Sequence, residues 1–321
     1  MTNSILVTVV MAIYKPNIDW LKEELASIST QTYKQFQVYA WNDDPNDEYD
    51  YNLLFSRYLK NIPFKIYHGT QNLGSNKVFE KLTMLVETPY IAYCDQDDVW
   101  HSDKISVLVN LLNKTNSTLA CSDMRVIDAK GRLICNKITD IRPRQTFVEG
   151  ELQIKTLLIR NFVTGCTMVI CTDMAKKAIP FPINMVHDHW LAFWNAVFGK
   201  IVVCHDSLID YRLHGNNQTG MLSGIMTKKD YYQRRSLPYY LKLCELNKYD
   251  FGYKINMQVY DDLYWAIKRI RYLNRPSIKN FILLLGCIRC NFFTTCFELL
   301  LPIMPKFIFK YIINIVREGI I

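Results

Sequence analysis

The stretch Tyr90-Ile-Ala-Tyr-Cys-Asp-Gln-Asp-Asp98 decides the fold, because an apolar run stops abruptly at three carboxylates. The run predicts a buried strand, and Asp95, Asp97 and Asp98 follow its carboxyl end. Three carboxylates within four residues repel one another unless a positive charge lies among them. We therefore predict a divalent cation with oxygen ligands, either Mg²⁺ or Mn²⁺. A turn or a helix N-cap is the structural alternative, since Asp is common in both.

On both sides of this stretch, apolar strand patterns alternate with helical patterns. Further strands are expected at Ile5–Met11, Phe36–Trp41, Phe64–Tyr67 and Leu119–Ser122. Helices are expected at Ile18–Ser29, Tyr49–Leu59, Val78–Val86 and Ile105–Leu112. The alternation predicts an α/β fold, with a mostly parallel sheet flanked by helices. Ligands of such sheets bind beyond the carboxyl ends of the strands.

A second acidic pair, Asp43-Asp44, follows the strand expected at Phe36–Trp41. The two acidic clusters should therefore lie at the same edge of the sheet. The sequence has no P-loop and no G-x-G-x-x-G motif. Walker-type ATP hydrolysis and Rossmann-type hydride transfer both lose support for this reason.

The composition is that of a folded protein with an uneven charge distribution. The 321 residues are 50% hydrophobic and carry a net charge of +8, which excludes a disordered or collagen-like chain. From Lys268 to Ile321 there are nine basic residues and two acidic ones, set among large apolar side chains. This mixture predicts helices, over Ile278–Ile321 above all, that lie in the interface of a membrane. A soluble helical cap with a basic outer face is the alternative.

Arg289, Pro302 and Pro305 interrupt the apolar runs of this tail, so a spanning helix is not expected. Nucleic acid is a poor partner, because the basic residues do not form a polar stripe. The first apolar run lacks the features of a signal peptide, and the ten scattered cysteines fit a reducing compartment. We expect a cytoplasmic protein that is peripheral on the inner face of the cell membrane.

Six motifs occur in the order typical of family 2 glycosyltransferases with the GT-A fold, which the chain resembles over about residues 5–220. They are Val7–Tyr14, Trp41–Asp44, Asn72–Gly74, Tyr93–Trp100, Val186–Trp190 and Tyr211–Asn217. The last three are most similar to rhamnosyltransferases of bacterial surface polysaccharides. Ala12 stands where the family often has Pro, and Pro45-Asn46 replaces the usual Gly-Ser.

The resemblance implies roles for individual residues. Asp97 would coordinate the metal, Asp95 would contact the metal and the donor's ribose or sugar, and His214 would complete the metal shell. Asp98 would support the ion from behind. Asp188 would be the catalytic base, and its alternative is an N-terminal cap for a helix at Trp190–Val197.

The remaining implied residues bind the nucleotide-sugar donor. Asp43 and Asp44 would accept hydrogen bonds from the base or the ribose, and Arg212 would pair with the diphosphate. The other donor-site residues are Ala12, Tyr14, Asn72 and Gly74. The loop Gly215–Met226, rich in Gly, Asn, Ser and Thr, would order over the donor as a lid, or it is a surface linker.

The resemblance thus implies an inverting glycosyltransferase that depends on Mn²⁺ or Mg²⁺. It would move rhamnose from dTDP-rhamnose to a lipid-linked saccharide during capsule or O-antigen synthesis. Residues 1–220 would form the GT-A catalytic domain and 221–321 a helical, basic and apolar extension that associates with the membrane. The alternatives are a UDP-hexose or UDP-N-acetylhexosamine transferase of the same fold, and a nucleotide-sugar-binding module without catalysis.

Overall fold

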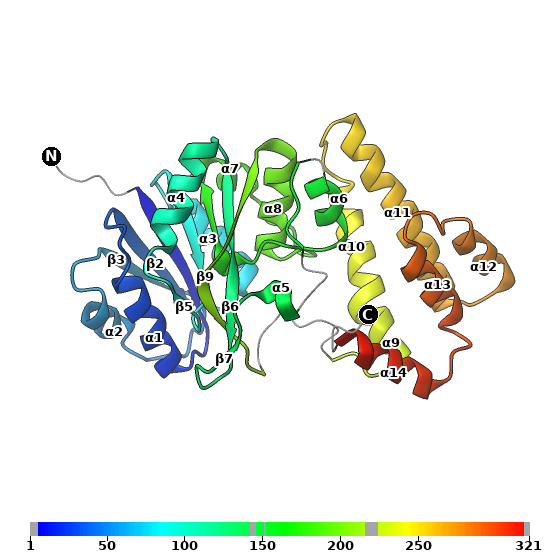
Figure 1. The fold of residues 1–321 in the computed structure, drawn as a ribbon, viewed down its shortest axis with the longest axis horizontal. Helices are drawn as coiled ribbons and strands as arrows, with labels where there is room; N and C mark the ends of the chain where they lie inside the picture. Colours follow the sequence, from blue (N-terminus) through cyan, green and yellow to red (C-terminus); the bar gives the residue numbers. More distant parts are fainter. Residues whose placement is uncertain (1–5, 142–145, 151, 216–223, 318–321) are drawn as a thin grey trace. The chain divides into compact units, whose positions relative to one another are not determined.

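The computed structural model describes residues 6–141, 146–150, 152–215 and 224–317. The chain divides into two compact units, residues 1–216 and residues 217–321. Figure 1 shows the first unit as a sheet with helices on its faces and the second as helices alone.

The strands of the first unit form one sheet in the order β3-β2-β1-β4-β8-β6-β9-β5, and β7 pairs with β6 outside this path. The strands are β1 Val7–Ile13, β2 Phe36–Asn42, β3 Phe64–His68, β4 Tyr90–Cys94, β5 Val99–Trp100, β6 Leu119–Ile127, β7 Leu133–Cys135, β8 Met168–Cys171 and β9 Ile201–Arg212.

The first half of the sheet is parallel. β1 pairs in parallel with β2 on one side and with β4 on the other, so that Met11 lies opposite both Ala40 and Cys94. Six of the seven residues of β1 are buried, as expected for a β-branched strand covered by helices on both faces. Parallel pairing brings the carboxyl ends of β1, β2 and β4 to one edge of the sheet, where the acidic clusters begin.

The second half of the sheet mixes both directions. β8 lies antiparallel between β4 and β6, and β9 runs parallel to β6 over a long ladder. β5 pairs with the end of β9, with Val99 opposite Asp210. This pairing places the last residues of β9 beside the Asp95–Asp98 loop, although more than 100 residues separate them in sequence.

The helices of the first unit are α1 Ile18–Ser29, α2 Tyr51–Tyr58, α3 Ser75–Leu85, α4 Lys104–Thr115, α5 Ile138–Ile141, α6 Leu152–Ile159, α7 Thr172–Lys177 and α8 His187–Phe198. α1 shows why these segments are helical. Its buried residues Leu21, Leu25 and Ile28 recur at helical spacing, and the Asn17 side chain caps its first turn.

The expected fold is confirmed: a mostly parallel sheet flanked by helices, with some antiparallel pairs. Element boundaries differ by a few residues from the sequence prediction. The helix expected at Val78–Val86 begins at Ser75, because Gly74 adopts a φ of 77° directly before it and lets the chain turn into the helix. The strand expected at Leu119–Ser122 continues to Ile127.

The second unit is helical throughout its described part. Its helices are α9 Lys228–Tyr231, the π-helical segment Tyr232–Ser236, α10 Leu237–Leu246, α11 Tyr253–Asn274, α12 Ile278–Leu285, α13 Phe292–Leu300 and α14 Lys306–Arg317. Among the described residues, no helix combines the length and the apolar character needed to cross a membrane. The lid expected at Gly215–Met226 falls mainly on residues 216–223, which lie outside the described part.

Candidate active site

The loop Asp95–Asp98 connects β4 to β5 and is held from the β1 side by a glutamine. Gln96 accepts a hydrogen bond from the Tyr14 amide at 2.8 Å and donates one to the Tyr14 carbonyl at 3.0 Å. Ala12 lies on β1 two residues earlier, opposite Trp41 of β2. The ends of β1 and β4 are therefore fixed to each other by a side chain of the acidic motif itself.

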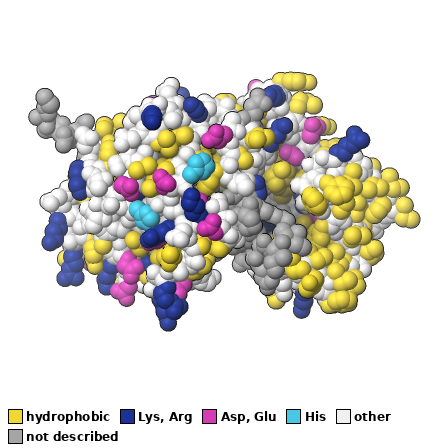
Figure 2. All heavy atoms as spheres, viewed as in Figure 1, with side chains coloured by type: hydrophobic (Ala, Val, Ile, Leu, Met, Phe, Trp, Pro, Cys, Tyr) yellow, Lys and Arg dark blue, Asp and Glu magenta, His cyan; other side chains and the backbone are white. Residues whose placement is uncertain are grey.

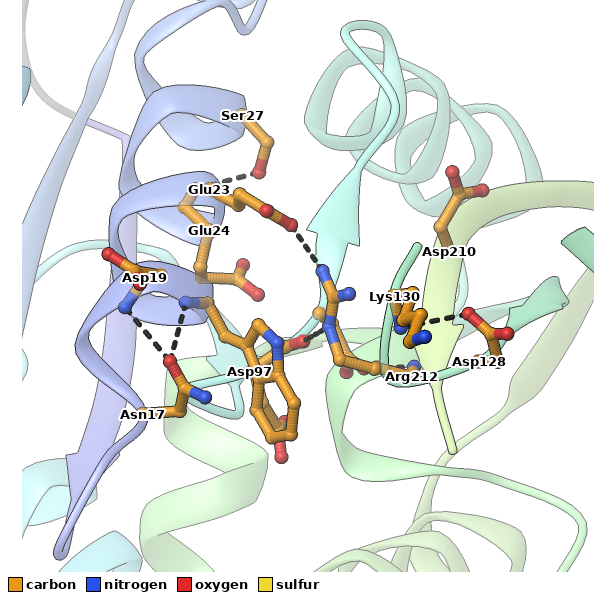
Figure 3. Close-up of polar contacts among 12 residues, drawn as sticks. Asn17, Asp19, Glu23, Glu24, Ser27, Asp97, Asp128, Lys130, Asp210 and Arg212 are labelled. Carbon is orange, nitrogen blue, oxygen red and sulfur yellow. Dashed lines mark hydrogen bonds and ion pairs between the residues drawn. The ribbon is translucent and has the colours of Figure 1, made fainter. Parts of the chain in front are cut away.

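Arg212, at the end of β9, holds the same loop from the other side. Its backbone amide donates to Asp98 Oδ1 at 2.9 Å, and its Nε donates to the Asp97 carbonyl at 2.8 Å. Figure 3 shows the guanidinium reaching on to α1, where it forms an ion pair with Glu23. It also lies 5.3 Å from the centre of the Trp20 ring.

The sequence predicted that Arg212 pairs with the donor's diphosphate, and this role stays a prediction; the structure shows which contacts Arg212 makes within the chain. Its side chain is 1% exposed, and its donors face acceptors of the chain itself. Its Nε and Nη2 are thus hydrogen-bonded to the acidic loop and to α1, so Arg212 positions the acidic loop.

His214 lies next to the central acid of the motif. Its Nε2 is 2.6 Å from Asp97 Oδ2, and the two side chains are only 12% and 18% exposed. Its ring also packs against Trp20, with 4.9 Å between ring centres. The structure thus brings together the two residues that the sequence paired as candidate metal ligands.

Asp188 lies in the first turn of α8, which begins at His187 with Val186 at the N-cap. The alternative interpretation of Asp188 as an N-cap is therefore wrong. Its Oδ2 accepts a hydrogen bond from the Gly165 amide at 3.1 Å, and its Oδ1 accepts one from the His189 amide at 2.5 Å. A side chain at position 165 would collide with His187, because a Cβ there would lie 2.8 Å from the ring Nε2.

Burial and mutual repulsion raise the pKa values of the acids in this site. The pKa of Asp188 rises to about 6, mainly through burial. The pKa of Asp95 rises to about 7 through burial and the nearby charges of Asp97 and Asp188. Burial and the nearby charges of Asp97 and Asp95 raise the pKa of Asp98 well above its usual range. Asp188 accepts a hydrogen bond from Gly165, and the thiol of the next residue, Cys166, lies within 4.8 Å of carboxylate oxygens of Asp95 and Asp98, so Asp188 and the acidic loop belong to one site.

The donor set fits a hard divalent cation. Carboxylate oxygens of Asp95 and Asp98 lie within 4.8 Å of each other and of the Cys166 thiol. Asp98 Oδ2 is buried and receives no N–H or O–H donor among the described residues. Burial raises the pKa of Cys166 well above its usual range, which keeps the thiol protonated and leaves the carboxylates as the ligands. Asp95 and Asp98 are thus brought together at this position, whereas Asp97 contacts His214.

Two buried charges behind the loop were missed by sequence reasoning. Glu24 and Lys104 are both completely buried, and burial lowers the pKa of Lys104 to about 8. The Lys104 ammonium donates to the Cys166 carbonyl at 2.5 Å. The signal was present, because Glu24 falls at helical spacing among the buried Leu21, Leu25 and Ile28. A charged residue on the apolar face of a helix is a reliable sign of a buried polar site.

The predicted donor residues gather where β2 ends. The Asp43 carboxylate is buried and accepts hydrogen bonds from the Leu73 and Gly74 amides, while Asn72 Nδ2 donates to the Asp43 carbonyl at 3.3 Å. Asp43, Asn72 and Gly74 therefore form one turn clamp. Asp44 is half-buried, and its carboxylate accepts only a local bond from Asn46 among the contacts described.

The model of Glycosyl transferase family 2 matches residues 8–176. An uncharacterized glycosyltransferase of Rickettsia prowazekii is 25% identical over 220 residues, which cover 67% of this chain and 66% of that protein. The dTDP-rhamnosyl transferase RfbG of Shigella flexneri is 24% identical over 218 residues, covering 63% and 71%. The chain spans between 30% and 67% of the length of the first three curated relatives.

Solved structures share the fold at low sequence identity. S. aureus TarS in complex with UDP-GlcNAc has a TM-score of 0.56 and 14% identity, covering 88% of this chain and 79% of that one. The mannosyltransferase PcManGT from Pyrobaculum calidifontis, in complex with GDP-Man and Mn²⁺, has a TM-score of 0.54 and 11% identity, covering 99% and 87%.

Proposed function

Because the chain belongs to Glycosyl transferase family 2 and carries that family's glycosyltransferase domain, we propose that it is an inverting, metal-dependent transferase. It moves a sugar from a nucleoside-diphosphate donor to a hydroxyl group of a saccharide acceptor. The observation that supports this best is the shared site of Asp188 and the Asp95–Asp98 loop. The charge of Asp188 raises the pKa of Asp95, so a base and a cation-binding cluster lie together.

Asp188 is the base of this proposal. Its carboxylate takes the proton of the acceptor hydroxyl while the acceptor oxygen bonds to the anomeric carbon of the donor. The bond between that carbon and the phosphate oxygen breaks, and its electron pair leaves with the nucleoside diphosphate. A pKa of about 6 keeps Asp188 ionised at neutral pH, yet makes it a stronger base than an ordinary aspartate.

The acids of the loop hold Mn²⁺ or Mg²⁺ in this proposal: Asp97, Asp95 and His214 as ligands, with Asp98 beside them. When bound, the cation supplies charge stabilisation to the leaving diphosphate. Arg212 and Gln96 keep the loop in place from its two sides. Asp44 and the turn clamp of Asp43, Asn72 and Gly74 receive the nucleoside, next to Ala12 and Tyr14.

The proposed donor is dTDP-rhamnose. The similarity to a dTDP-rhamnosyl transferase and the forms of the last three sequence motifs support it. A UDP-N-acetylhexosamine or UDP-hexose donor is the second candidate, supported by the fold shared with TarS, whose structure contains UDP-GlcNAc. The proposed acceptor is a lipid-linked saccharide at the cytoplasmic face of the membrane, as in capsule or O-antigen synthesis.

A donor screen tests the proposal. The purified protein is incubated with Mn²⁺ or Mg²⁺, a lipid extract as acceptor source, and dTDP-rhamnose, UDP-glucose, UDP-N-acetylglucosamine or GDP-mannose in parallel. The released nucleoside diphosphate is measured. We expect release from dTDP-rhamnose, and loss of release when EDTA is added.

Two controls separate the competing functions. A nucleotide-sugar-binding module would bind a donor, measured by calorimetry, without releasing diphosphate at any acceptor concentration. Release that continues undiminished in excess EDTA contradicts the role of the cation. A strong preference for a UDP-sugar replaces the rhamnosyl donor by the second candidate and leaves the transfer chemistry in place.

A further inference from the structure

The last three helices of the second unit expose an unusual amount of apolar surface. Within α12, α13, α14 and the turns between them, large apolar side chains between 37% and 83% exposed are Ile278, Phe281, Ile282, Leu285, Phe292, Phe293, Leu300, Ile303, Phe307, Ile308 and Tyr311. We call this set the apolar surface. Figure 2 shows hydrophobic side chains gathered over the region that Figure 1 labels α12 and α13.

α14 shows that this exposure is not an unfilled core. Phe309 and Ile313 are buried in a cluster of their own, whereas Phe307, Ile308 and Tyr311 are exposed. At about 100° per residue these two groups fall on opposite sides of the helix. The helix therefore carries one apolar face for its own unit and a second one that nothing in the described chain covers.

The charges that accompany the apolar surface have one sign. From Arg271 to Val316 the exposed charged residues are Arg271, Arg275, Lys279, Arg289, Lys306 and Lys310. The only acid in that range is Glu298, which is completely buried and bonded to Arg269. The structure thus buries the one negative charge of this range, and the exposed charges that remain in the range are all basic; an exposed acid outside it, Asp261 of α11, lies near Cys290.

We propose that the apolar surface docks this protein on an anionic lipid bilayer. Exposed Phe, Ile and Leu side chains enter the boundary between headgroups and acyl chains, while the lysines and arginines around them contact lipid phosphates. The inference deepens the proposed function, on which it rests for the lipid-linked acceptor, by naming the surface that brings the enzyme to it. The binding itself does not require catalysis.

Charge selects the lipid over a second copy of the chain. In a symmetric dimer through this surface, Lys306 and Lys310 would face basic residues of the other copy, with no exposed acid in that range to pair with them. An anionic bilayer supplies both an apolar phase and negative charge. Large solvated apolar patches on a protein commonly mark such contacts.

A buried ion pair inside the unit connects its helices. Glu298 binds Arg269 through two hydrogen bonds of 2.6 and 2.7 Å, and Tyr231 and Ser236 donate to the same carboxylate. Truncation after Arg275 would remove Glu298 and leave Arg269 buried without its partner. Substitutions on the surface therefore test the proposal more cleanly than deletion.

Flotation of the full-length protein with vesicles is the test. Vesicles of phosphatidylcholine with phosphatidylglycerol are compared with vesicles of phosphatidylcholine alone, at low and high salt. We expect binding to the anionic vesicles that weakens as salt rises. The double variant F293S/F307S should bind at least about tenfold more weakly, because two large apolar side chains no longer enter the bilayer.

Two further variants locate the effect. K306Q/K310Q should lose binding to anionic vesicles by about fivefold for each charge and keep whatever affinity it has for neutral ones. L53S is the matched apolar control, since Leu53 is 68% exposed on α2 of the first unit, outside the apolar surface. It should float like the unmodified protein. Circular dichroism verifies that all variants are folded.

The proposal is overturned if the unmodified protein stays unbound with anionic vesicles at low salt. It is equally overturned if light scattering shows a dimer that F293S/F307S dissociates while vesicle binding is absent, because a second copy is then the occupant. Release of diphosphate in vesicle-free solution is measured alongside. It reports on the proposed function alone, so failure of docking and failure of catalysis are distinguishable.

Discussion

Each unit of this molecule is organised around a buried arginine, and the two arginines differ in what surrounds them. Arg269 of the second unit meets both oxygens of the completely buried Glu298. Arg212 of the first unit meets Glu23, which is 54% exposed, and a backbone carbonyl of the acidic loop. Both guanidinium side chains are almost fully buried, at 6% and 1% exposure.

This difference indicates that Arg269 has a structural role, whereas Arg212 belongs to a functional site. Arg269 is paired with a carboxylate of opposite charge through two hydrogen bonds, and this pair connects α11 to α13. In the acidic loop that Arg212 holds, burial and the neighbouring carboxylates raise the pKa values of Asp95 and Asp98, and burial alone raises that of Asp188. Strong unbalanced charge inside a protein commonly marks a functional site, because it needs an external partner to relieve it.

The largest expected effect comes from removing the central acid of the unbalanced cluster. Asp97→Asn should lower transfer by about 10⁴-fold, since the cation contributes several kcal/mol to the stabilisation of the leaving group. The fold should persist, because Asp97 holds the protein only through its carbonyl and its contact with His214. Steady-state release of nucleoside diphosphate measures the loss.

Asp206→Asn is the matched control, since Asp206 is an exposed aspartate on β9. It should change neither activity nor Mn²⁺ affinity. If Asp97→Asn keeps most of the activity, the acidic cluster beside Arg212 does not serve catalysis. The distinction between a functional site at Arg212 and a structural pair at Arg269 is then wrong.

The base gives the next largest effect. Asp188→Asn should slow transfer by about 10³-fold, a value typical of a lost general base, while leaving donor affinity nearly unchanged. In the unmodified enzyme kcat/KM should fall as pH drops through about 6, because protonated Asp188 does not accept the acceptor's proton. A carboxyl group with an ordinary pKa near 4 would give a flat profile above pH 5.

The profile is measured between about pH 5 and 8 at saturating Mn²⁺. If Asp188 is the base, the residual rate of Asp188→Asn should no longer fall near pH 6. If Asp188 is only structural and another group titrates, the rate of the variant should still fall there. A variant that loses donor binding instead would place Asp188 in the donor site.

A change in the Arg269–Glu298 pair should lower the free energy of unfolding and leave the rate of sugar transfer unchanged. Glu298→Gln leaves Arg269 buried without a countercharge, and removal of one partner of a buried pair typically costs about 3–5 kcal/mol. Denaturant unfolding, followed by tryptophan fluorescence, should report this loss in the second unit. Release of nucleoside diphosphate from the donor, measured with a water-soluble acceptor, should be unchanged at low temperature, where both units stay folded.

The sequence predicted the fold class because its causes are local. The alternation of apolar runs and the acids at strand ends are visible within a few residues, as in Tyr90–Cys94 followed by Asp95. The membership of the family followed from motifs of the same local kind and is confirmed by the family match. The individual roles of Asp97, Asp188 and His214 stay predictions, since they need a bound donor and cation to be tested.

What the sequence did not predict depends on long-range contacts. Arg212 was assigned to the diphosphate because its motif suggested a phosphate-binding arginine, yet its partner Glu23 lies 189 residues away. No local sequence pattern predicts that contact, because it depends on β9 ending beside α1 and the acidic loop in the folded chain. Lys104 was overlooked for a different reason. It lies on the buried face of α4 with Leu108 and Leu112, and its spacing from these two residues was the only feature of the sequence that indicated its burial.

The smallest effect, and the one that sharpens the comparison most, is expected from Arg212→Lys. Lysine keeps the positive charge but loses the planar group that bonds Glu23 and the Asp97 carbonyl at once. Substitution of residues that orient metal ligands typically costs 10–100-fold in metal affinity, so the Kd for Mn²⁺ should rise by about tenfold. Calorimetric titration of Mn²⁺ measures this Kd, and kcat at saturating Mn²⁺ should recover most of its value.

Arg269→Lys is the parallel change in the second unit and should lower stability without any change in Mn²⁺ affinity. If Arg212→Lys behaves like Arg269→Lys, both arginines are scaffolds. A recovered kcat with weakened Mn²⁺ binding instead establishes that the position of the acidic loop, and not its charge alone, sets the affinity of this site for its cation.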